Sequence, residues 1–389
     1  MADSEPCERT ERNADHLISF ELPAKVEFGP GRIGILERVI EEAEFERVAF
    51  VMTSGRRRSG MLDPILSRLA ASGMEVLVFD RVAPNPTLTT VARCTRRLRR
   101  FAPHVVVGIG GGSALDTAKA AAACVANRTE NVVDLLDAEL TKRRSVPTIL
   151  IPTTAGTGTE VNYWAVITDE DAREKLSIGT PKMAPYMAII DPSLALSVPP
   201  DLTLWTGIDA LTHAIEAFIS SSGNWLSDMF CLGAVSLITE WLGHAIVQGD
   251  DLSARGSLAL ASLLAGAAME NVGLGLVHAM SHQIGGFYDS PHGQVNAALL
   301  PHVLDFNEPA CEAKVATLDG LLKETGTLRA WLDWLLRSYA ASARPQQIKA
   351  ADLPEMARRA ATNVNAQTNP RKATEEEIAA IYRTAFEVV

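Results

Sequence analysis

Short apolar runs and amphipathic stretches alternate through the first half of the chain. Runs rich in β-branched residues lie at residues 47–52, 75–80, 104–110 and 148–154. Between them, residues 62–71 and 87–101 place apolar side chains at the spacing of one helix face. Strands that alternate with helices of this length indicate βαβ units and a mostly parallel sheet. The nearly continuous apolar runs are typical of strands covered on both faces.

The pattern changes near residue 200. Residues 189–200 end an extended region with Pro199 and Pro200, which resist the continuation of either a strand or a helix. The Ala- and Leu-rich residues 203–220, 225–247 and 252–270 then follow with helical spacing, and no convincing strand pattern returns. We therefore predict an α/β domain over residues 1–199 and an all-helical domain over residues 200–389.

A glycine cluster links one predicted strand to one predicted helix. Gly110, Gly111 and Gly112 can adopt backbone angles closed to other residues and let a ligand approach the main chain. Ser113 then opens a helix whose free N–H groups favour an anion. A strand, a glycine turn and a helix N-terminus together hold dinucleotide pyrophosphates, although a tight turn without a ligand gives the same pattern.

A second loop of small residues, 152–160, follows the next strand. Thr153 and Thr154 stand at its carboxyl end, where open α/β sheets bind ligands. Their hydroxyls suit a ribose or a phosphate, and two such loops at successive strand ends are harder to explain as simple turns.

The second half contains a cluster of metal-binding side chains. Asp209 and His213 are four residues apart, as are His278 and His282, so each pair shares one face of a predicted helix. We expect helix breaks at residues 285–286 and 290–291, just before His292. One carboxylate and three imidazoles suit a divalent transition metal such as Fe²⁺ or Zn²⁺. A single histidine would more often be a buried structural residue, but the joint pattern favours a metal site.

Charge and cysteine content limit the classes of partner and the cellular compartment that we expect. The chain has 47 Asp and Glu against 36 Lys and Arg, and this net charge of −11 disfavours a nucleic-acid partner. The five cysteines show no CxxC spacing, which favours a reducing compartment over a disulfide framework. Residues 1–15 are polar, like a frayed tail and unlike a signal peptide. The longest apolar stretches are interrupted by glycine, histidine or charged residues before they reach the roughly 20 residues that a membrane span needs. We expect a cytoplasmic protein without membrane contact.

The ordered set of motifs resembles the iron-containing, or group III, alcohol dehydrogenases. It comprises PNPT at 84–87, GGGSALDTAK at 110–119, PTTAGTGTE at 152–160, DALTHAIEAF at 209–218, GLVHAMSHQIGGFYDSPHG at 275–293 and TNPR at 368–371. The resemblance spans nearly all of the chain after residue 20. It implies a Rossmann-like first domain, a helical second domain and a cleft between them, the two-domain plan of dehydroquinate synthase.

The resemblance also implies roles for particular residues. The metal ligands would be Asp209, His213, His278 and His292, and His282 would lie near the substrate as a catalytic proton-relay residue. The cofactor contacts would come from Ser54, Gly110, Gly111, Gly112, Ser113, Asp116, Thr153, Thr154 and Lys175.

The implied activity is hydride transfer between a small primary alcohol, or its aldehyde, and NAD(P)(H), with aldehyde reduction as the expected direction. The metal would make an alcohol hydroxyl more acidic and polarise an aldehyde carbonyl. We also expect a homodimer or a larger homo-oligomer. Three alternatives remain open: a metal-independent reductase like the maleylacetate reductases, a lyase or cyclase like dehydroquinate synthase, and a non-catalytic dinucleotide-binding protein.

One departure from the family bears on the cofactor. Many relatives have an aspartate after the first of these strands to hold the adenosine ribose, whereas this chain has Ser54 and Gly55 there, followed by Arg56, Arg57 and Arg58. Loss of a carboxylate removes repulsion against a 2′-phosphate, and arginines pair with phosphate. We therefore expect NADPH to be accepted, although a solvated arginine loop would look the same.

Overall fold

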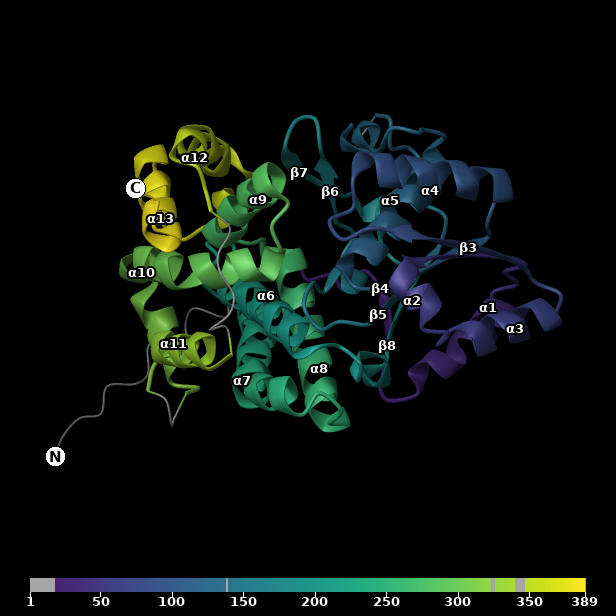
Figure 1. Ribbon diagram of the computed structural model, residues 1–389, viewed down its shortest axis with the longest axis horizontal. Helices are drawn as coiled ribbons and strands as arrows, with labels where there is room; N and C mark the ends of the chain where they lie inside the picture. The colour runs from purple at the N-terminus through teal and green to yellow at the C-terminus, as the bar shows by residue number, and fades with distance from the viewer. Residues whose placement is uncertain (1–17, 138, 323–325, 340–346, 389) are drawn as a thin grey trace.

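A computed structural model describes residues 18–137, 139–322, 326–339 and 347–388. The predicted tail at residues 1–15 lies outside these ranges. The chain forms two halves that lie side by side, with the sheet on the right of Figure 1 and a helical assembly on the left. The predicted fold class, a mostly parallel α/β domain followed by a helical domain, is confirmed.

The first half is built on a six-stranded parallel sheet in the order β1-β8-β5-β4-β2-β3. The strands are β1 (Lys25–Phe28), β2 (Arg47–Thr53), β3 (Glu75–Val82), β4 (Val105–Gly110), β5 (Thr148–Pro152) and β8 (Met187–Ile190). The four apolar runs of the sequence form β2, β3, β4 and β5. The sequence analysis missed β1 and β8, because each has only four residues.

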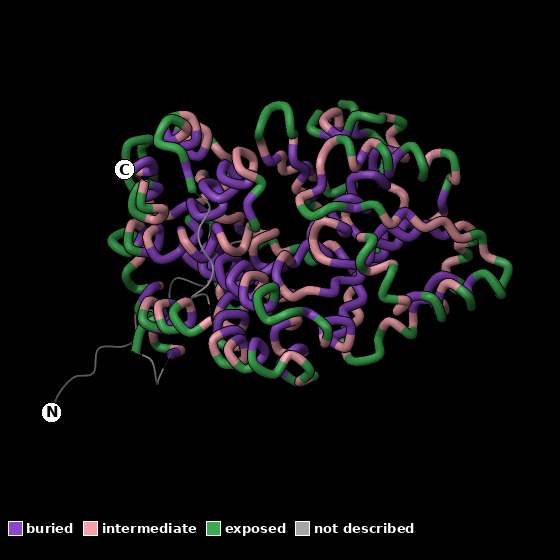
Figure 2. The backbone as a smooth tube through the Cα atoms, viewed as in Figure 1, coloured by how far each residue is buried: buried purple, intermediate pink, exposed green. Residues whose placement is uncertain are grey.

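Helices cover both faces of this sheet. Buried side chains of α1 (Leu36–Glu42) and α3 (Asp63–Ala71) pack in one cluster, and those of α4 (Leu88–Phe101) and α5 (Gly112–Asn127) pack in another. A short helix, α2 (Ser54–Arg58), follows β2 directly. Figure 2 shows buried backbone running through the sheet and through the centre of the helical half. The doubly wound arrangement leaves the carboxyl ends of the strands free to bind a ligand.

An antiparallel hairpin of β6 (Ala165–Asp169) and β7 (Glu174–Ile178) stands apart from the main sheet. Figure 1 shows it at the top of the molecule, between the two halves and next to α9. The sequence analysis missed this hairpin, because its polar residues lack the apolar runs that marked the other strands.

The second half is helical throughout the described residues. Its helices are α6 (Pro200–Ile219), α7 (Trp225–Val247), α8 (Leu252–Val272), α9 (Leu276–Tyr288), α10 (His292–Asp319), α11 (Leu328–Tyr339), α12 (Leu353–Thr362) and α13 (Glu375–Phe386). Pro200 is the first residue of α6, a position where its fixed φ suits a helix and its missing N–H costs nothing. The domain boundary between residues 199 and 200 stays a prediction.

The expectation about apolar length was wrong for two helices. Trp225–Val247 and Leu252–Val272 are long and apolar enough by composition to cross a membrane. Both contribute to the core of the helical half, where their buried residues pack with those of α6. An interior helix of a globular domain meets the same criterion of length and composition.

Candidate metal centre and cofactor cradle

Three helices bring the candidate metal ligands together. Asp209 and His213 lie one turn apart on α6, His278 and His282 lie one turn apart on α9, and His292 is the first residue of α10. Helix α6 is buried along most of its length, so its two polar side chains face protein interior. The four-residue spacing thus correctly predicted that the two residues of each pair share a helix face. The packing of α6, α9 and α10 then brings the side chains of the three helices together.

The ligand atoms of Asp209, His278 and His292 all lie within 4.8 Å of one another. Asp209 Oδ1 is 3.5 Å from His292 Nε2, 3.8 Å from His278 Nε2 and 3.9 Å from His213 Nε2. The His213 and His278 rings stack, with centroids 4.5 Å apart. One carboxylate oxygen surrounded by three imidazole nitrogens is the donor set of a Zn²⁺ or Fe²⁺ site.

Two hydrogen bonds fix which ring nitrogen faces the centre. His213 Nδ1 is 3.2 Å from the carbonyl oxygen of Gly156, and His278 Nδ1 is 2.6 Å from Glu216 Oε2. Each Nδ1–H therefore donates outward and leaves Nε2 to accept a cation. A histidine ligand whose other nitrogen donates to a carboxylate or a carbonyl is a common feature of metal sites.

The sequence analysis missed Glu216, although a signal was present. Glu216 is seven residues after Asp209, so two helical turns place both carboxylates on one face of α6. It is 1% exposed, and its other oxygen, Oε1, accepts the backbone N–H of Val277 at 2.6 Å. Glu216 therefore holds both the ring of His278 and the first turn of α9.

Two asparagines also position Asp209 and the start of α9. Asn296, one turn after His292, donates to Asp209 Oδ1 at 2.8 Å. Asn369, from the TNPR motif, accepts the backbone N–H of Leu276 at 3.1 Å and exchanges side-chain hydrogen bonds with Asn307. The TNPR motif therefore anchors the start of the helix that bears His278.

Burial and charge set the protonation of the cluster. Burial lowers the pKa of His213 to about 4 and those of His282 and His292 well below the usual value. Burial would raise the pKa of Asp209, but the neighbouring imidazoles outweigh it and hold that pKa below its usual value. Burial also opposes a proton on His278, yet Glu216 and Asp209 raise its pKa to about 9. A metal ion at the centre would compete with that proton.

Unsatisfied polar atoms indicate that the centre suits a cation. Among the described residues, His278 Nε2, His282 Nδ1, His292 Nδ1 and Asn296 Oδ1 are buried without a hydrogen-bond partner. Buried polar atoms in folded proteins almost always have partners, and His278 Nε2, 3.8 Å from Asp209 Oδ1, is an orphan that a cation between the two would satisfy. The residues present therefore fit a divalent metal.

The glycine after His292 is required by close packing. A Cβ on Gly293 would lie 2.1 Å from the carbonyl oxygen of Trp205 on α6. We expect Gly293→Ala to cost about 1–3 kcal/mol of unfolding free energy, since overpacking forces α10 away from α6. The shift would also displace His292 and weaken metal binding.

Thermal unfolding and metal titration of this variant test the expectation. The matched control is Gly256→Ala on α8, where the nearest atom is 3.8 Å away and an alanine has room. Equal melting temperatures and metal affinities for both variants would contradict the packing argument.

One predicted helix break was wrong. Gly285 and Gly286 lie inside α9, which continues to Tyr288, and the chain breaks only at residues 289–291. The glycines are there because the β6–β7 hairpin packs against them. A Cβ on Gly285 would lie 2.5 Å from Lys175 Cε, and one on Gly286 would lie 2.5 Å from the carbonyl oxygen of Arg173.

This contact brings Lys175 toward the centre. Its side chain is buried, and Nζ donates to Asn85 Oδ1 of the PNPT motif at 3.1 Å. Asn85 in turn donates to Asp289 Oδ1 at 2.7 Å, which joins the two halves beside the loop that precedes His292. The sequence analysis named Lys175 but not Asn85 as a contact residue.

The glycine cluster forms a tight turn at the start of α5. Gly110 has a φ of 147°, which L side chains rarely adopt, and Gly111 is the N-cap of α5 without a side-chain cap. A Cβ on Gly112 would lie 2.7 Å from Thr157 Cγ2. Ser113 follows in the first turn of the helix. Uncapped N–H groups at this helix start suit a phosphate.

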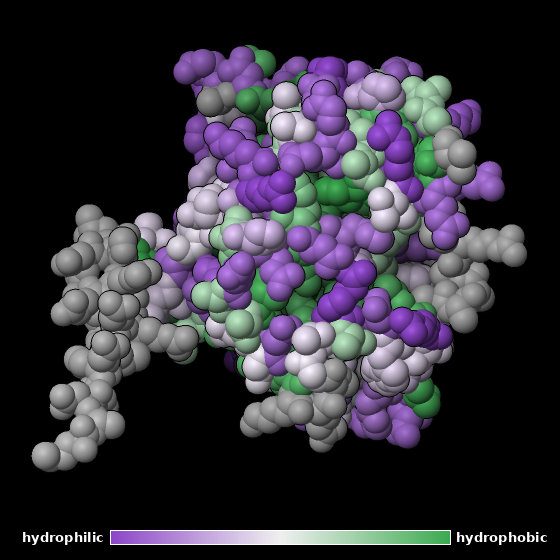
Figure 3. All heavy atoms as spheres, turned by 90° about the vertical axis from the view of Figure 1, so that its left-hand side faces the viewer, coloured by the Kyte–Doolittle hydropathy of each residue, from purple (hydrophilic) through white to green (hydrophobic). Residues whose placement is uncertain are grey.

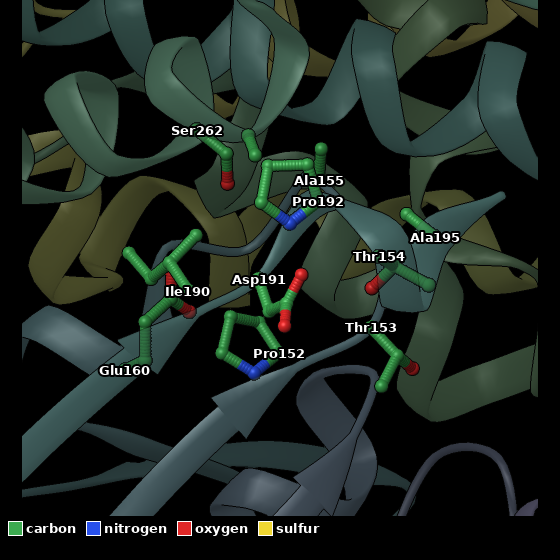
Figure 4. A pocket seen from close by; sticks show the side chains of 11 residues that line it. Pro152, Thr153, Thr154, Ala155, Glu160, Ile190, Asp191, Pro192, Ala195 and Ser262 are labelled. Atoms are coloured by element: carbon green, nitrogen blue, oxygen red, sulfur yellow. The ribbon is translucent and has the colours of Figure 1, made fainter. Parts of the chain in front are cut away.

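The second loop adjoins this turn at the carboxyl ends of β5 and β8. Thr153 N donates to the carbonyl oxygen of Gly110 at 2.9 Å. A small pocket lies here. Figure 4 shows the side chains of Thr153 and Thr154 on one side of it, Glu160 on the other and Asp191 in the middle. The pocket beside the glycine turn lies at the carboxyl ends of the strands, where open α/β sheets bind ligands.

One predicted cofactor contact, Asp116, has other partners in the structure, and another, Ser54, is exposed. Asp116 accepts from Thr159 Oγ1 at 2.5 Å and from the backbone N–H of Val166 at 3.0 Å. Ser54 is exposed as the first residue of α2. The three arginines after it differ. Arg56 donates to Thr153 Oγ1 at 2.8 Å, Arg57 pairs with Asp63, and Arg58 is exposed.

A candidate metal centre beside a dinucleotide cradle is the arrangement of a metal-dependent dehydrogenase. Comparison with known proteins agrees. Residues 23–192 match the family model described as "Iron-containing alcohol dehydrogenase", and residues 203–386 match "Fe-containing alcohol dehydrogenase family, C-terminal". The chain belongs to the iron-containing alcohol dehydrogenase family.

Individual relatives cover nearly the whole chain. The 1,3-propanediol dehydrogenase of Klebsiella pneumoniae is 38% identical over 384 residues, which span 95% of this chain and 99% of the relative. An NAD-dependent methanol dehydrogenase of Bacillus methanolicus is 32% identical over 95% of this chain and 100% of its own. The crystal structure of a 1,3-propanediol oxidoreductase superposes with a TM-score of 0.86 at 36% identity, over 95% of this chain and all of the other.

These relatives confirm the predicted activity class. The protein is an alcohol and aldehyde oxidoreductase of the iron-containing family, and its described residues include a group that could hold a metal ion. A lyase or cyclase and a non-catalytic dinucleotide-binding protein are both disfavoured, because the relatives are named as dehydrogenases.

Proposed function

We propose that the protein reduces a small aldehyde to its primary alcohol with NAD(P)H at a centre formed by Asp209, His213, His278 and His292. The main support is the convergence of three ligand atoms within 4.8 Å, one of which, His278 Nε2, is buried without a hydrogen-bond partner. Iron or zinc suits this donor set. The cofactor would lie along Gly110–Ser113, Thr153, Thr154 and Lys175, and the predicted contacts Ser54 and Asp116 stay part of this proposal.

A metal held by these residues would supply Lewis-acid chemistry, and a nicotinamide in the cradle would supply the hydride. Reduction of an aldehyde adds that hydride to the carbonyl carbon and a proton to the carbonyl oxygen. The chain must therefore hold the nicotinamide over the carbonyl and deliver that proton.

His282 is the residue we assign to proton delivery. It is 5% exposed, one turn from His278, and its ring centroid is 5.5 Å from that of His292. Its Nδ1 is buried without a partner, so the ring is free to exchange a proton with a bound substrate. Lys175, held by Asn85 next to α9, adds positive charge at the same end of the cleft.

A reconstitution assay tests this function. The purified protein is stripped of metal, reloaded with Fe²⁺ or Zn²⁺, and assayed for oxidation of NADH and NADPH with a panel of small aldehydes. We expect turnover only after metal loading. Equal turnover by the stripped protein would instead support a metal-independent reductase like the maleylacetate reductases.

We further propose that NADP(H) is accepted alongside NAD(H). Ser54 leaves the end of β2 without a carboxylate, and exposed Arg58 adds positive charge nearby. We expect Ser54→Asp to lower kcat/KM for NADPH by tenfold or more and leave that for NADH nearly unchanged, because about 1.4 kcal/mol of charge repulsion gives a factor of ten.

Steady-state kinetics with both cofactors measure the effect. Ser72→Asp, an equivalent change at an exposed residue after α3, is the matched control. A wild-type enzyme with strong NADH preference, unaffected by Ser54→Asp, would sink the proposal.

The remaining expectations concern the setting of the enzyme. A cytoplasmic location and a homodimer or larger homo-oligomer stay predictions. Exposed apolar residues on α7, such as Trp225 and Met229, favour self-association. Figure 3 shows the helical half from its outer side, with apolar residues emerging between hydrophilic ones.

A further inference from the structure

Lys119 on α5 is a buried cation that neither the metal centre nor the cradle uses directly. Its side chain is fully buried, and Nζ lies among five oxygen atoms. They are Thr159 O at 2.8 Å, Thr159 Oγ1 at 2.6 Å, Asn162 O at 3.2 Å, Asn162 Oδ1 at 3.1 Å and Trp164 O. All five belong to residues 159–164, which continue the second small-residue loop.

The surroundings keep this ammonium charged. Asp116 Oδ1 is 3.8 Å from Nζ, and Glu160 and Glu270 also favour the charged form. Burial nevertheless lowers the pKa of Lys119 to about 8. A buried charge is stable only when hydrogen bonds and opposite charge compensate its lost hydration. Convergence of three backbone carbonyls on one ammonium therefore ties the conformation of the loop to this residue.

The loop that Lys119 holds touches every part of the site. Thr153 and Thr154 at its start border the pocket at the end of β5. The carbonyl oxygen of Gly156 accepts from His213 Nδ1. Gly158, which has a φ of 58°, approaches so closely that its Cβ would lie 2.6 Å from the Cα of Gly266 on α8. The loop thus spans from the cofactor cradle to the helical half.

We propose that Lys119 is a positioning residue, a built-in cation that fixes residues 153–164 so that the threonines meet the cofactor and the Gly156 carbonyl meets His213. This inference rests on the proposed cofactor and metal sites. In a similar ring of oxygens, a bound metal or potassium ion would take the place of the Lys119 ammonium. A tethered ammonium occupies the place permanently and comes from α5, the helix whose N-terminus forms part of the proposed cofactor cradle.

The test removes the ammonium and then supplies one from solution. In Lys119→Ala, we expect the Kd for NADH to rise about tenfold, because a small misplacement of a binding loop is costly. We expect propylammonium, which fits the vacated side-chain volume, to restore most of the affinity. The KM for cofactor should change more than kcat, and the Kd for Zn²⁺ should rise with that for NADH.

Lys182→Ala is the matched control, because its Nζ donates to one carbonyl, that of Thr141 at 2.7 Å, away from the loop. It should keep wild-type affinity and show no response to propylammonium. Lys119→Met, which fills the space without a charge, separates charge from volume and should bind NADH as weakly as Lys119→Ala.

Wild-type NADH and Zn²⁺ affinity in Lys119→Met would overturn the inference, as would a loss in Lys119→Ala that propylammonium leaves unchanged. If Lys119→Ala is recovered only as unfolded protein, the NADH and Zn²⁺ affinities of Lys119→Met decide the inference. NADH binding is measured without turnover, so a wild-type protein that binds NADH but reduces no aldehyde sinks the proposed function alone.

Discussion

Replacement of Asp209 by alanine is expected to abolish metal binding and lower kcat/KM by about 1000-fold or more. Asp209 Oδ1 is the atom around which the three imidazole nitrogens gather, within 3.9 Å of each. Asp209 is the one carboxylate among the four proposed ligands, so its loss would leave a neutral donor set. A lost metal removes several kcal/mol of transition-state stabilisation, and each 1.4 kcal/mol is a factor of ten in rate.

Elemental analysis after dialysis and steady-state kinetics measure these two effects together. Asp250→Ala, an exposed position between α7 and α8, is the control for loss of one negative charge. Circular dichroism and thermal melting establish that the variant is folded. Retention of stoichiometric metal and of near wild-type kcat/KM by a folded Asp209→Ala protein would refute the assignment of the centre.

Glu216→Gln is expected to weaken metal binding by roughly 10–100-fold, the usual effect of removing the outer partner of a histidine ligand. The amide keeps the size of the side chain and can still accept from Val277 N. It no longer offers a charged acceptor to His278 Nδ1–H, and an NH₂ facing that nitrogen favours the opposite tautomer. The ring would then present Nε2–H to the cation.

Competition with a chromophoric chelator gives the metal affinity of each protein. Glu308→Gln makes the same change at an exposed residue of α10 and should leave the affinity unchanged. Saturating metal should restore much of the activity of Glu216→Gln, because the outer partner only orients a ligand. An unchanged affinity would mean that the 2.6 Å contact is only structural.

The sequence revealed those parts of the fold whose residues repeat one pattern. Strands β2 to β5 are nearly continuous apolar runs, and α6 to α8 are long and rich in Ala and Leu. Strand β1, with four residues and alternating charge, has no such signature and forms only because β8 pairs with it. The β6–β7 hairpin likewise packs against distant elements, with Ala165 and Ile167 in the cluster of α4 and α5 and Lys175 against Gly285 of α9.

In the site, too, features set by local spacing were predictable and features set by distant contacts were not. Spacing of four residues was enough to pair Asp209 with His213 and His278 with His282, because helix geometry is local. The breaks assigned to Gly285 and Gly286 failed for the opposite reason, since what these glycines accommodate is Lys175 and Arg173, more than 100 residues earlier. Glu216 was readable from its seven-residue offset, but an isolated glutamate on an apolar helix does not reveal its partner.

All four proposed ligands lie after Pro200, whereas Lys175 and the carbonyl of Gly156 come from the sheet half. The helical half alone therefore has the side chains to capture an ion, yet it lacks the groups that would make the ion useful for hydride transfer. Metal binding and hydride transfer therefore depend on different parts of the chain. If the β6–β7 hairpin moved a few ångströms away from Gly285, the Lys175 ammonium would leave the site while the four proposed metal ligands stayed in place. A movement confined to the hairpin would leave His213 on the Gly156 carbonyl, whereas a movement of the loop at residues 153–164 would disturb that ligand as well.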